Sequence, residues 1–591
     1  MNVGPLGFLL LCCIPTIHAQ IVNSTLGQIR GQTTIVLGKT VRVFYGIPFA
    51  KPPINTLRFK HPVLADPWYP NVKNATTKKA SCYQYIPHKP NPLEQIPPLV
   101  SEDCLYLNIF APPPSQHGTP KAVMVFLYGG AFVSGSINAP MFDGKILASV
   151  NDVVVVTVNY RVGVLGFLYL DANTVPGNMG LMDQRLAIKW VHDNIQNFGG
   201  DSNRITLFGQ SAGAGSVSHH LLSPLSQPFF TSAIIQSGSP LTSWDLLTAK
   251  EAQTHANAIA KKANCTNIHT NAEIYECLNE QKPESLIILQ NGLVQGANVA
   301  FGPVVDGTFL PDRPLAILEK GAEKNTSVLL GVTQNEGALF LFFGLPSEFK
   351  WQDNLTITDA QFMANLEAQG KLQGGSNATV QTLYQEYVLS RVESERDYVA
   401  IADEILGDYS FKCPVTRFAG FLARSNPTYI YSFNHRLLSA KEPNWMGVKH
   451  GGEQPLVWGH ALDPNVNLTF TDDEKTLSRV IMSYWTNFAK FGDPNGESST
   501  LTQWPRFDNL HERYLNLDVG SNLATGQGLR RRQCVCLYQT VPLVASLEQR
   551  EPKSDTTSEP CNGPVNGDTR QTQAHTTLMT TLLVVWIAAQ A

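Results

Sequence analysis

The sequence predicts an α/β fold with a mostly parallel central sheet flanked by helices, and three observations support this prediction. Two short, nearly continuous apolar runs rich in β-branched residues, 122–127 and 152–158, are typical of strands buried on both faces. The segment 183–197 has apolar residues at helical spacing and precedes a third strand-like run at 204–208. A fourth candidate strand follows at 232–236. Strands and helices that alternate in this way favour a parallel sheet covered by helices.

One uninterrupted segment, 20–547, forms the body of the chain and contains all of these runs. It has no internal repeat and no low-complexity linker, so we expect a single α/β unit although the chain has 591 residues. The formal net charge of −4 gives no indication of nucleic-acid binding, and we expect none. The basic triplet 530–532 is better explained as a solvated turn than as a site for an anionic partner.

Residues 1–19 have the features of a signal peptide. The apolar run 7–14 is too short to span a bilayer, and Ala19 offers a cleavage site before Gln20. Seven N-x-S/T sequons favour the same secretory route. The predicted glycosylation sites are Asn23, Asn74, Asn264, Asn325, Asn354, Asn377 and Asn467.

The C-terminal end predicts a membrane anchor of the GPI type. Residues 548–577 are polar and rich in Ser, Thr and Pro, so they cannot bury enough apolar surface to fold, and we expect a stalk. The apolar segment 578–591 has no basic flank, and Asn566 or Gly567 would be the attachment site. We expect removal of this segment and a protein that is secreted or held on the outer face of the plasma membrane. A plain hydrophobic end or a tail anchor is the alternative.

Cys12 and Cys13 lie in the predicted signal peptide, so its removal would leave eight of the ten cysteines. In an oxidising compartment disulfides are their expected state, although spacing does not fix the pairing. No C-x-x-C pair with partner histidines is present, so the sequence predicts no metal, and the chemistry below requires no cofactor.

The pentapeptide Gly-Gln-Ser-Ala-Gly at 209–213 has the G-x-S-x-G pattern of a nucleophile elbow. It lies between the strand-like run 204–208 and small residues that can begin a helix, which is the context that this pattern requires. Such a turn is so tight that only small flanking residues avoid a clash. It would expose the hydroxyl of Ser211 above the end of the sheet, where a base and a substrate carbonyl can reach it.

A serine needs a base to take its proton and an acid to hold that base in one tautomer. Among fourteen histidines, His450 is the best local candidate, because the glycines at 451–452 let a loop bring its ring close to other backbone. For the acid, Glu336 follows the strand-like run 327–330 and so lies on a loop at the carboxyl end of a strand. Spacing alone leaves open the alternative that each is a solvated surface residue.

A negative charge forms on the substrate oxygen when a serine attacks, and backbone N–H groups must stabilise it. One such group is the N–H of Ala212, directly after the nucleophile. The glycine-rich loop 128–132 follows an early strand and would supply the others. A structural glycine turn is the alternative, which the presence of the elbow disfavours.

Further motifs lie across the body, at 45–50, 101–108, 159–163, 190–195, 198–201 and 236–240. With the elbow, they resemble the cholinesterase and type-B carboxylesterase family over nearly the whole body. The resemblance implies an α/β-hydrolase fold, Ser211 as nucleophile, His450 as general acid and base, and Glu336 as the orienting acid. It also implies that the N–H groups of Gly130, Ala131 and Ala212 form the oxyanion hole, with Ala131 in place of the family's third glycine.

The resemblance further implies three disulfides, Cys82–Cys104, Cys265–Cys277 and Cys413–Cys534. Two cysteines then stand outside the family pattern. We expect Cys536 to be a buried thiol. Cys561 resembles the intersubunit cysteine of cholinesterase tails and predicts a disulfide-linked homodimer.

Three departures from the family pattern weaken a site for a quaternary ammonium group, which aromatic faces bind best. The segment between Cys82 and Cys104 contains tyrosines but lacks the tryptophan that cholinesterases have there. Gln210 replaces the usual glutamate before the nucleophile, and Leu339 replaces an aromatic residue, while Phe340 keeps one. Loss of the tryptophan would forfeit roughly 1–2 kcal/mol, about ten-fold in binding.

The acyl side of the predicted pocket has room for more than an acetyl group. Trp244 resembles a wall of this pocket, whereas Ala297 and Val299 stand where acetyl-selective members carry bulky aromatic residues. Smaller side chains leave space for longer acyl groups, and each buried methylene adds about 0.8 kcal/mol. The alternative is that other side chains fill the space.

We therefore expect a serine hydrolase that cleaves carboxylic esters through an acyl-enzyme, with small-molecule esters as substrates and a degraded choline site. A true cholinesterase whose cation site uses other aromatic residues is one alternative. A cell-surface adhesion protein of the same fold is another, which the presence of all three triad residues disfavours.

Overall fold

The computed structural model describes residues 20–548 except 87–90, 115–117, 267–268, 292, 294–299, 373–374 and 498–500. The predicted leader, the stalk from 549 onward and the apolar C-terminal segment lie outside the described residues. In the part of the chain that the structure describes, no helix has the length and apolar character needed to cross a membrane.

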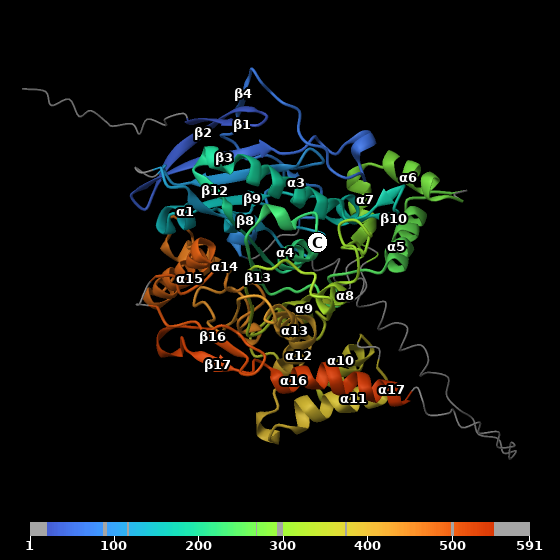
Figure 1. Cartoon of the computed structure of the whole chain (residues 1–591). Coiled ribbons are helices and arrows are strands. Elements are labelled where there is room, and N and C mark those ends of the chain that lie inside the picture. Colours follow the sequence, from blue (N-terminus) through green and yellow to red (C-terminus); the bar gives the residue numbers. More distant parts are fainter. Residues whose placement is uncertain are drawn as a thin grey trace, which may run out of the picture.

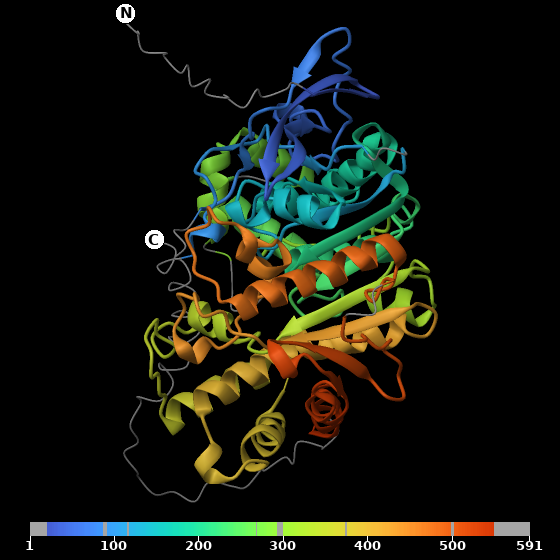
Figure 2. The ribbon, with the colours of Figure 1, turned by 90° about the vertical axis from the view of Figure 1, so that its left-hand side faces the viewer.

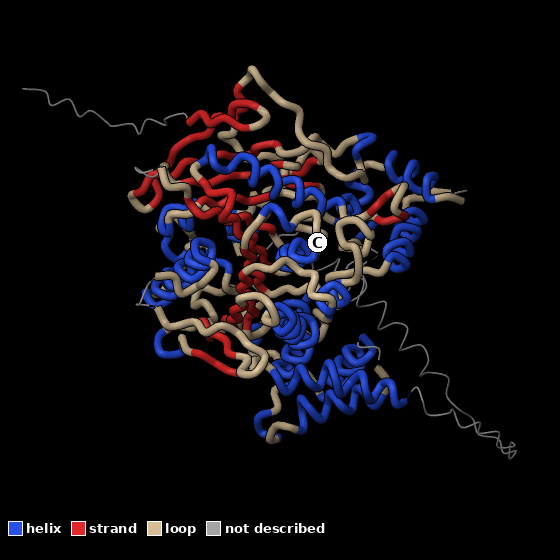
Figure 3. The backbone as a smooth tube through the Cα atoms, in the orientation of Figure 1, coloured by secondary structure: helices blue, strands red, loops and turns tan. Residues whose placement is uncertain are grey.

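A sheet of 13 strands runs through the middle of the molecule (Figures 1 and 3). Its central strands, from β9 to β16, are parallel, and antiparallel strands extend it at both edges. This topology confirms the predicted fold class. In spatial order the strands are β1(Gln20–Ser24), β2(Gly27–Val36), β3(Lys39–Pro48), β7(Tyr106–Ala111), β9(Val154–Val158), β8(Lys121–Leu127), β12(Gly200–Gln210), β13(Ser232–Gln236), β14(Ser327–Thr333), β15(Thr428–Phe433), β16(Arg513–Leu517) and β17(Thr525–Gln527), with β4(Val72–Asn74) paired to β2.

The runs rich in β-branched residues form the buried centre of this sheet. Every residue of β9, β13 and β15 is buried, as expected for strands that are covered on both faces. Because the central strands are parallel, their carboxyl ends meet at one edge of the sheet. The loops that follow β8, β12 and β14 therefore emerge close together, and these loops carry most of the candidate site residues.

Helices cover both faces of the sheet. On one face lie α3(Met179–Asn194), α4(Ala212–Leu222) and α13(Cys413–Leu422), and on the other lie α1(Lys145–Asn151), α14(Gln454–Val457) and α15(Asp472–Phe491). The sequence of α15 explains its limits, because Thr471 and Glu474 form a capping box at its start and Gly492 ends it in a left-handed conformation. Figure 2 shows α15, in orange, lying over the strands.

A smaller helical layer lies at one end of the molecule, at the bottom of Figure 1. It has its own apolar core, which includes Phe362, Leu383 and Ile405. Its helices are α10(Asp359–Leu372), α11(Asn377–Tyr384), α12(Tyr398–Gly407), α16(Arg531–Val535) and α17(Val541–Glu548). The remaining helices and strands are α2(Gly163–Phe167), α5(Ala249–Lys262), α6(Asn271–Glu280), α7(Pro283–Asn291), α8(Pro314–Glu319), α9(Ala338–Gly344), β5(Ser81–Cys82), β6(Val100–Ser101), β10(Tyr169–Asp171) and β11(Val175–Pro176).

Candidate active site

Ser211 lies in the sharp turn between β12 and α4, with a φ of 58° and a ψ of −128°. This left-handed backbone is strained for any residue with a side chain. A Cβ added at Gly209 would clash with the carbonyl oxygen of Gly213, and one added at Gly213 would clash with that of Leu127. The turn therefore needs glycine on both sides, as the G-x-S-x-G pattern requires, and it leaves only 9% of Ser211 exposed.

Glu336 lies on the loop between β14 and α9, where it is buried and both carboxylate oxygens are hydrogen-bonded. Oε2 lies 2.5 Å from Nδ1 of His450. Oε1 accepts hydrogen bonds from the hydroxyl of Ser237 at 2.6 Å and from the N–H of Thr333 at 2.7 Å. Burial acts to raise the pKa of Glu336, but the interaction with His450 and these hydrogen bonds outweigh burial and lower the pKa. The carboxylate therefore stays ionised beside the imidazole.

Asn335 fixes the loop that carries His450 to the loop that carries Glu336. The N–H of Asn335 donates to the carbonyl of Val448 at 3.0 Å, and the N–H of Val448 donates to Oδ1 of Asn335 at 2.9 Å. Gly447 has a φ of 52° and comes so close to Asn335 that a Cβ there would clash. This pair of hydrogen bonds brings His450 to Glu336, although 114 residues separate them in the chain.

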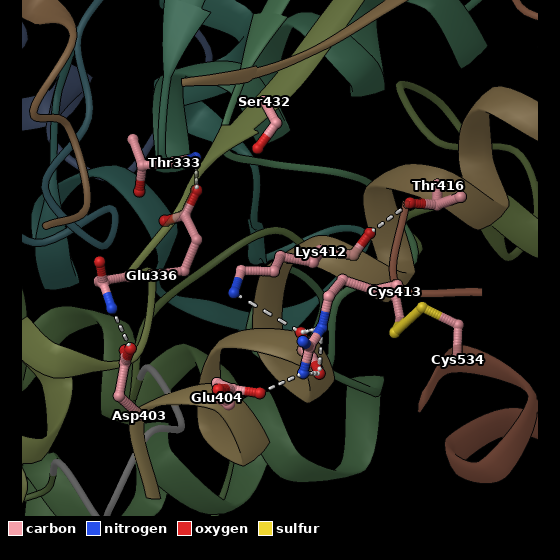
Figure 4. Close-up of polar contacts among 12 residues, drawn as sticks. Thr333, Glu336, Asp403, Glu404, Lys412, Cys413, Thr416, Ser432 and Cys534 are labelled. Carbon is pink, nitrogen blue, oxygen red and sulfur yellow. Dashed lines mark hydrogen bonds and ion pairs between the residues drawn. A yellow bond between two sulfur atoms is a disulfide. The ribbon is translucent and has the colours of Figure 1, made fainter. Parts of the chain in front are cut away.

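Polar side chains also join the acid loop to the helical layer, where Figure 4 labels Asp403 and Glu404. The side-chain amide of Asn335 donates to Oδ2 of Asp403 at 2.7 Å. Burial raises the pKa of Asp403 to about 6, although nearby charge and hydrogen bonds oppose it. Beside it, Arg530 bridges Glu404 at 2.7 Å and Asp408 at 2.5 Å. The acid loop is thereby supported by α12 through Asp403.

Within the described residues, no hydrogen bond joins Ser211 to His450. The side-chain nitrogen of Gln210 instead lies 3.0 Å from Nε2 of His450. The rings of Phe340 and Phe411 pack against the imidazole, with centroids at 5.1 and 4.6 Å. The structure thus pairs Glu336 with the predicted base and places an amide at the ring nitrogen that would serve the serine.

Three N–H groups beside the elbow, those of Gly130, Ala131 and Ala212, donate no hydrogen bond within the part of the chain that the structure describes. The loop that holds the first two follows β8, and it touches the elbow, because a Cβ added at Gly129 would lie 2.8 Å from the Cβ of Ser211. Unpaired N–H groups beside a nucleophile are what an oxyanion hole requires. A strained serine, a carboxylate-bound imidazole and unpaired N–H groups together suit acyl transfer.

The residues predicted to line the substrate pocket are only partly described. Trp244 is buried, and its indole N–H donates to a backbone carbonyl at 3.0 Å. Leu339 and Phe340 lie in α9, and both are half-buried. Ala297 and Val299 lie outside the described residues, so the size of the acyl pocket stays a prediction.

Cysteine pairing follows the family pattern, with disulfides Cys82–Cys104, Cys265–Cys277 and Cys413–Cys534. Cys536 is an unpaired thiol whose pKa burial raises to about 11. Cys561 lies outside the described residues. Between residues 20 and 548, as far as they are described, no group of three His, Cys, Asp or Glu side chains is arranged to hold a metal ion.

Four residues that hold the acid and its loop have no role that the sequence predicts: Ser237, Thr333, Asn335 and Asp403. Ser237 lies within one of the family motifs and Asn335 is adjacent to Glu336, so position in the chain could have marked these two. Thr333 acts through its backbone N–H, and Asp403 comes from a distant helix. Neither leaves a local pattern in the sequence.

Comparisons with known proteins identify relatives of this chain. Residues 18–537 match the family model described as the Carboxylesterase family. A cholinesterase from Mus musculus is 39% identical over 546 residues, which cover 89% of this chain and 88% of that protein. An acetylcholinesterase from Bungarus fasciatus is 37% identical over 556 residues, which cover 90% of this chain and 89% of that protein. The matched range contains the whole described sheet and the predicted nucleophile, base and acid.

Proposed function

The chain belongs to the carboxylesterase family, and on that premise we propose that it is an active esterase whose nucleophile is Ser211. The observation that carries the proposal is the 2.5 Å contact between the buried carboxylate of Glu336 and Nδ1 of His450. A carboxylate at this nitrogen holds the imidazole in the tautomer whose other nitrogen can accept a proton. An adhesion protein of this fold has no need of that pairing.

In the proposed reaction, Nε2 of His450 removes the hydroxyl proton of Ser211 as the serine oxygen attacks the ester carbonyl. Glu336 stabilises the imidazolium that forms, and the three unpaired N–H groups bind the oxyanion. His450 then donates its proton to the leaving alcohol, which departs and leaves an acyl-enzyme. Water repeats the cycle, releases the acid and restores Ser211.

We propose neutral aryl and alkyl esters, rather than choline esters, as the preferred substrates. The amide of Gln210 brings no negative charge to the site, and Leu339 offers no aromatic face to a cation. Phe340 is already stacked on Phe411 at 5.0 Å and packed against His450. A quaternary ammonium group would therefore gain little here beyond burial of its methyl groups.

Cholinesterase activity is the second candidate, because the two relatives named above are a cholinesterase and an acetylcholinesterase. One structural observation favours it. The hydroxyl of Tyr83 donates to Glu284 at 2.7 Å, which joins an aromatic ring to a carboxylate, and both kinds of group attract a quaternary ammonium ion.

Hydrolysis rates of matched esters decide between these candidates. The full-length chain, made in a secretory host, would be assayed on aryl acetate and butyrate and on acetyl- and butyrylthiocholine, with Ser211→Ala as the blank. Choline esters at least about ten-fold slower than aryl esters of the same acyl length would support the proposal. Equal or faster choline-ester turnover would favour a cholinesterase. Absence of any turnover that depends on Ser211 would favour the adhesion alternative.

We further propose that the protein is a secreted or GPI-anchored glycoprotein. All seven predicted acceptor asparagines are exposed, as glycosylation requires, and disulfides are typical of the secretory route. An endoglycosidase should lower the apparent mass, and a phospholipase that cleaves GPI should release the protein from cells. Cys561→Ser should convert a disulfide-linked dimer to a monomer on a non-reducing gel.

A further inference from the structure

The side chain of Gln210 makes a contact that the proposed reaction does not use. Its Nε2 lies 3.0 Å from Nε2 of His450. Because Glu336 accepts the hydrogen of Nδ1, the neutral imidazole presents a lone pair at Nε2, and the amide N–H donates to that lone pair. The lone pair that must take the proton of Ser211 therefore already accepts a hydrogen bond from Gln210.

The strand pairing and the neighbouring glycines fix the position of the Gln210 side-chain amide. Gln210 is the last residue of β12 and pairs in register with Gln236 of β13, so its backbone is fixed. A Cβ added at Gly129 would clash with the carbonyl oxygen of Gln210, and one added at Gly451 would lie 3.3 Å from its Nε2. Glycines on both sides thus leave a slot that fits the amide beside the imidazole.

Other charged groups on the segment of His450 are engaged elsewhere. Lys449, the preceding residue, pairs with Glu94 at 2.9 Å and with Glu442 at 2.7 Å. The carboxylate of Glu453 accepts a hydrogen bond from the side chain of Gln236 at 2.9 Å. Neither Lys449 nor Glu453 is hydrogen-bonded to the imidazole.

The side chains that pack against the faces of the imidazole ring are aromatic and carry no charge. Phe340 comes from α9, and Phe411 comes from the segment that follows α12. Glu336 is the only titratable group within the described residues that is hydrogen-bonded to the imidazole, and it holds Nδ1. The environment of Nε2 is therefore set by Gln210.

We propose that Gln210 is a positioning residue that keeps His450 neutral in the resting enzyme and sets the pH above which the base can act on Ser211. The proposal rests on the esterase function proposed above. A donor at the lone pair favours the neutral ring, whereas a carboxylate at the same place would accept from the imidazolium and favour the charged ring. When His450 takes the serine proton, its Nε2 becomes a donor, so Gln210 must then turn its Oε1 toward the ring or move away.

Three variants test this role. Gln210→Met removes the donor, Gln210→Asn keeps an amide that is too short to reach the ring, and Gln210→Glu replaces the donor with a carboxylate. Each would be assayed for the pH dependence of kcat/KM on a neutral aryl acetate and for the pH dependence of Ser211 labelling by a fluorophosphonate. Thermal unfolding would show that each variant is folded.

We expect the acid limb of both profiles to move to higher pH by about 0.5 unit in the Met and Asn variants, the effect of one lost hydrogen bond. The Glu variant should move by about one unit or more, because the hydrogen bond is then charge-assisted. Unchanged limbs in the Met and Asn variants would overturn the proposal, even if the Glu variant moved, since added charge alone would explain that shift. Labelling without ester turnover would contradict the proposed function but still report on Gln210.

Discussion

The hydroxyl of Ser237 donates a hydrogen bond of 2.6 Å to Oε1 of Glu336, the carboxylate oxygen that does not contact His450. Because Oε1 also accepts from the N–H of Thr333, the two oxygens of Glu336 have separate tasks. One anchors the carboxylate to the sheet, and the other holds the imidazole. This division fixes the orientation of the carboxylate.

Replacement of Ser237 by alanine should lower kcat on an aryl ester by about ten-fold. A hydrogen bond to a charged group contributes about 1.5–3 kcal/mol, and part of that is lost from the orientation of Glu336. Steady-state kinetics of Ser237→Ala and Ser237→Cys would measure this effect, since the thiol keeps a weak donor without a β-branch at the φ of 55° of this buried residue and should recover part of the rate. Equal losses in both variants would contradict a role for the hydroxyl.

Ser237→Ala should also make the protein less resistant to acid. The pKa of Glu336 is lowered in the folded state, so its contribution to stability is complete above the ordinary glutamate pKa and is lost as the pH falls through the folded pKa. Removal of the Ser237 hydrogen bond brings the folded pKa closer to the ordinary value. The midpoint of acid unfolding, followed by circular dichroism, should therefore move to higher pH. An unchanged midpoint would show that Ser237 does not stabilise the carboxylate.

Replacement of Glu336 by glutamine should reduce kcat by about 10³–10⁴-fold while the protein stays folded, because the amide no longer holds His450 in the required tautomer. Turnover of an aryl acetate, corrected with the Ser211→Ala blank, is the measurement. The matched control is Glu404→Gln, a carboxylate on α12 that pairs with Arg530 and does not touch the imidazole. A Glu336→Gln variant that keeps more than about a tenth of the activity would exclude the proposed role of Glu336.

Much of the fold could be predicted from the sequence because the signals were local. The β-branched runs at 122–127 and 152–158 needed burial on both faces, and the elbow at 209–213 required a strand before it and a helix after it. His450 and Glu336 needed the added support of the family resemblance, because loop position alone did not distinguish them from surface residues. The contact between Gln210 and His450 joins residues 240 apart and depends on side-chain conformation, so no pattern in the sequence could reveal it.

Replacement of Asn335 by alanine should reduce kcat by about 10- to 100-fold with little change in KM, because the loop of His450 loses its hydrogen bond from Val448 while the substrate site is untouched. The melting temperature should also fall, since the N–H of Val448 is left without its partner. The matched control is Asn434→Ala, whose amide bonds Asn516 on a neighbouring strand instead of either site loop. Equal kinetic effects in the two variants would contradict a positioning role for Asn335.

Replacement of Asp403 by asparagine should raise the free energy of unfolding relative to the parent protein by more at neutral pH than at acid pH. Burial raises the pKa of Asp403 to about 6, so between about pH 4 and pH 6 the folded protein binds more protons than the unfolded chain. The contribution of Asp403 to the stability of the parent protein must therefore fall across this window as the pH rises, whereas asparagine carries no proton to lose. The difference in unfolding free energy between variant and parent should grow by at most about 3 kcal/mol from pH 4 to pH 7.

Urea unfolding of Asp403→Asn and of the parent at pH 4, 5, 6 and 7 measures this difference. The kcat of the variant should change little, because the new amide oxygen can still accept the 2.7 Å hydrogen bond from Asn335 that supports the acid loop. Asp403→Leu, which removes that acceptor, should lower kcat as well. A difference in stability that stays constant with pH would mean that Asp403 is ionised throughout. The hydrogen bond from Asn335 to Asp403 would then be charge-assisted at every pH.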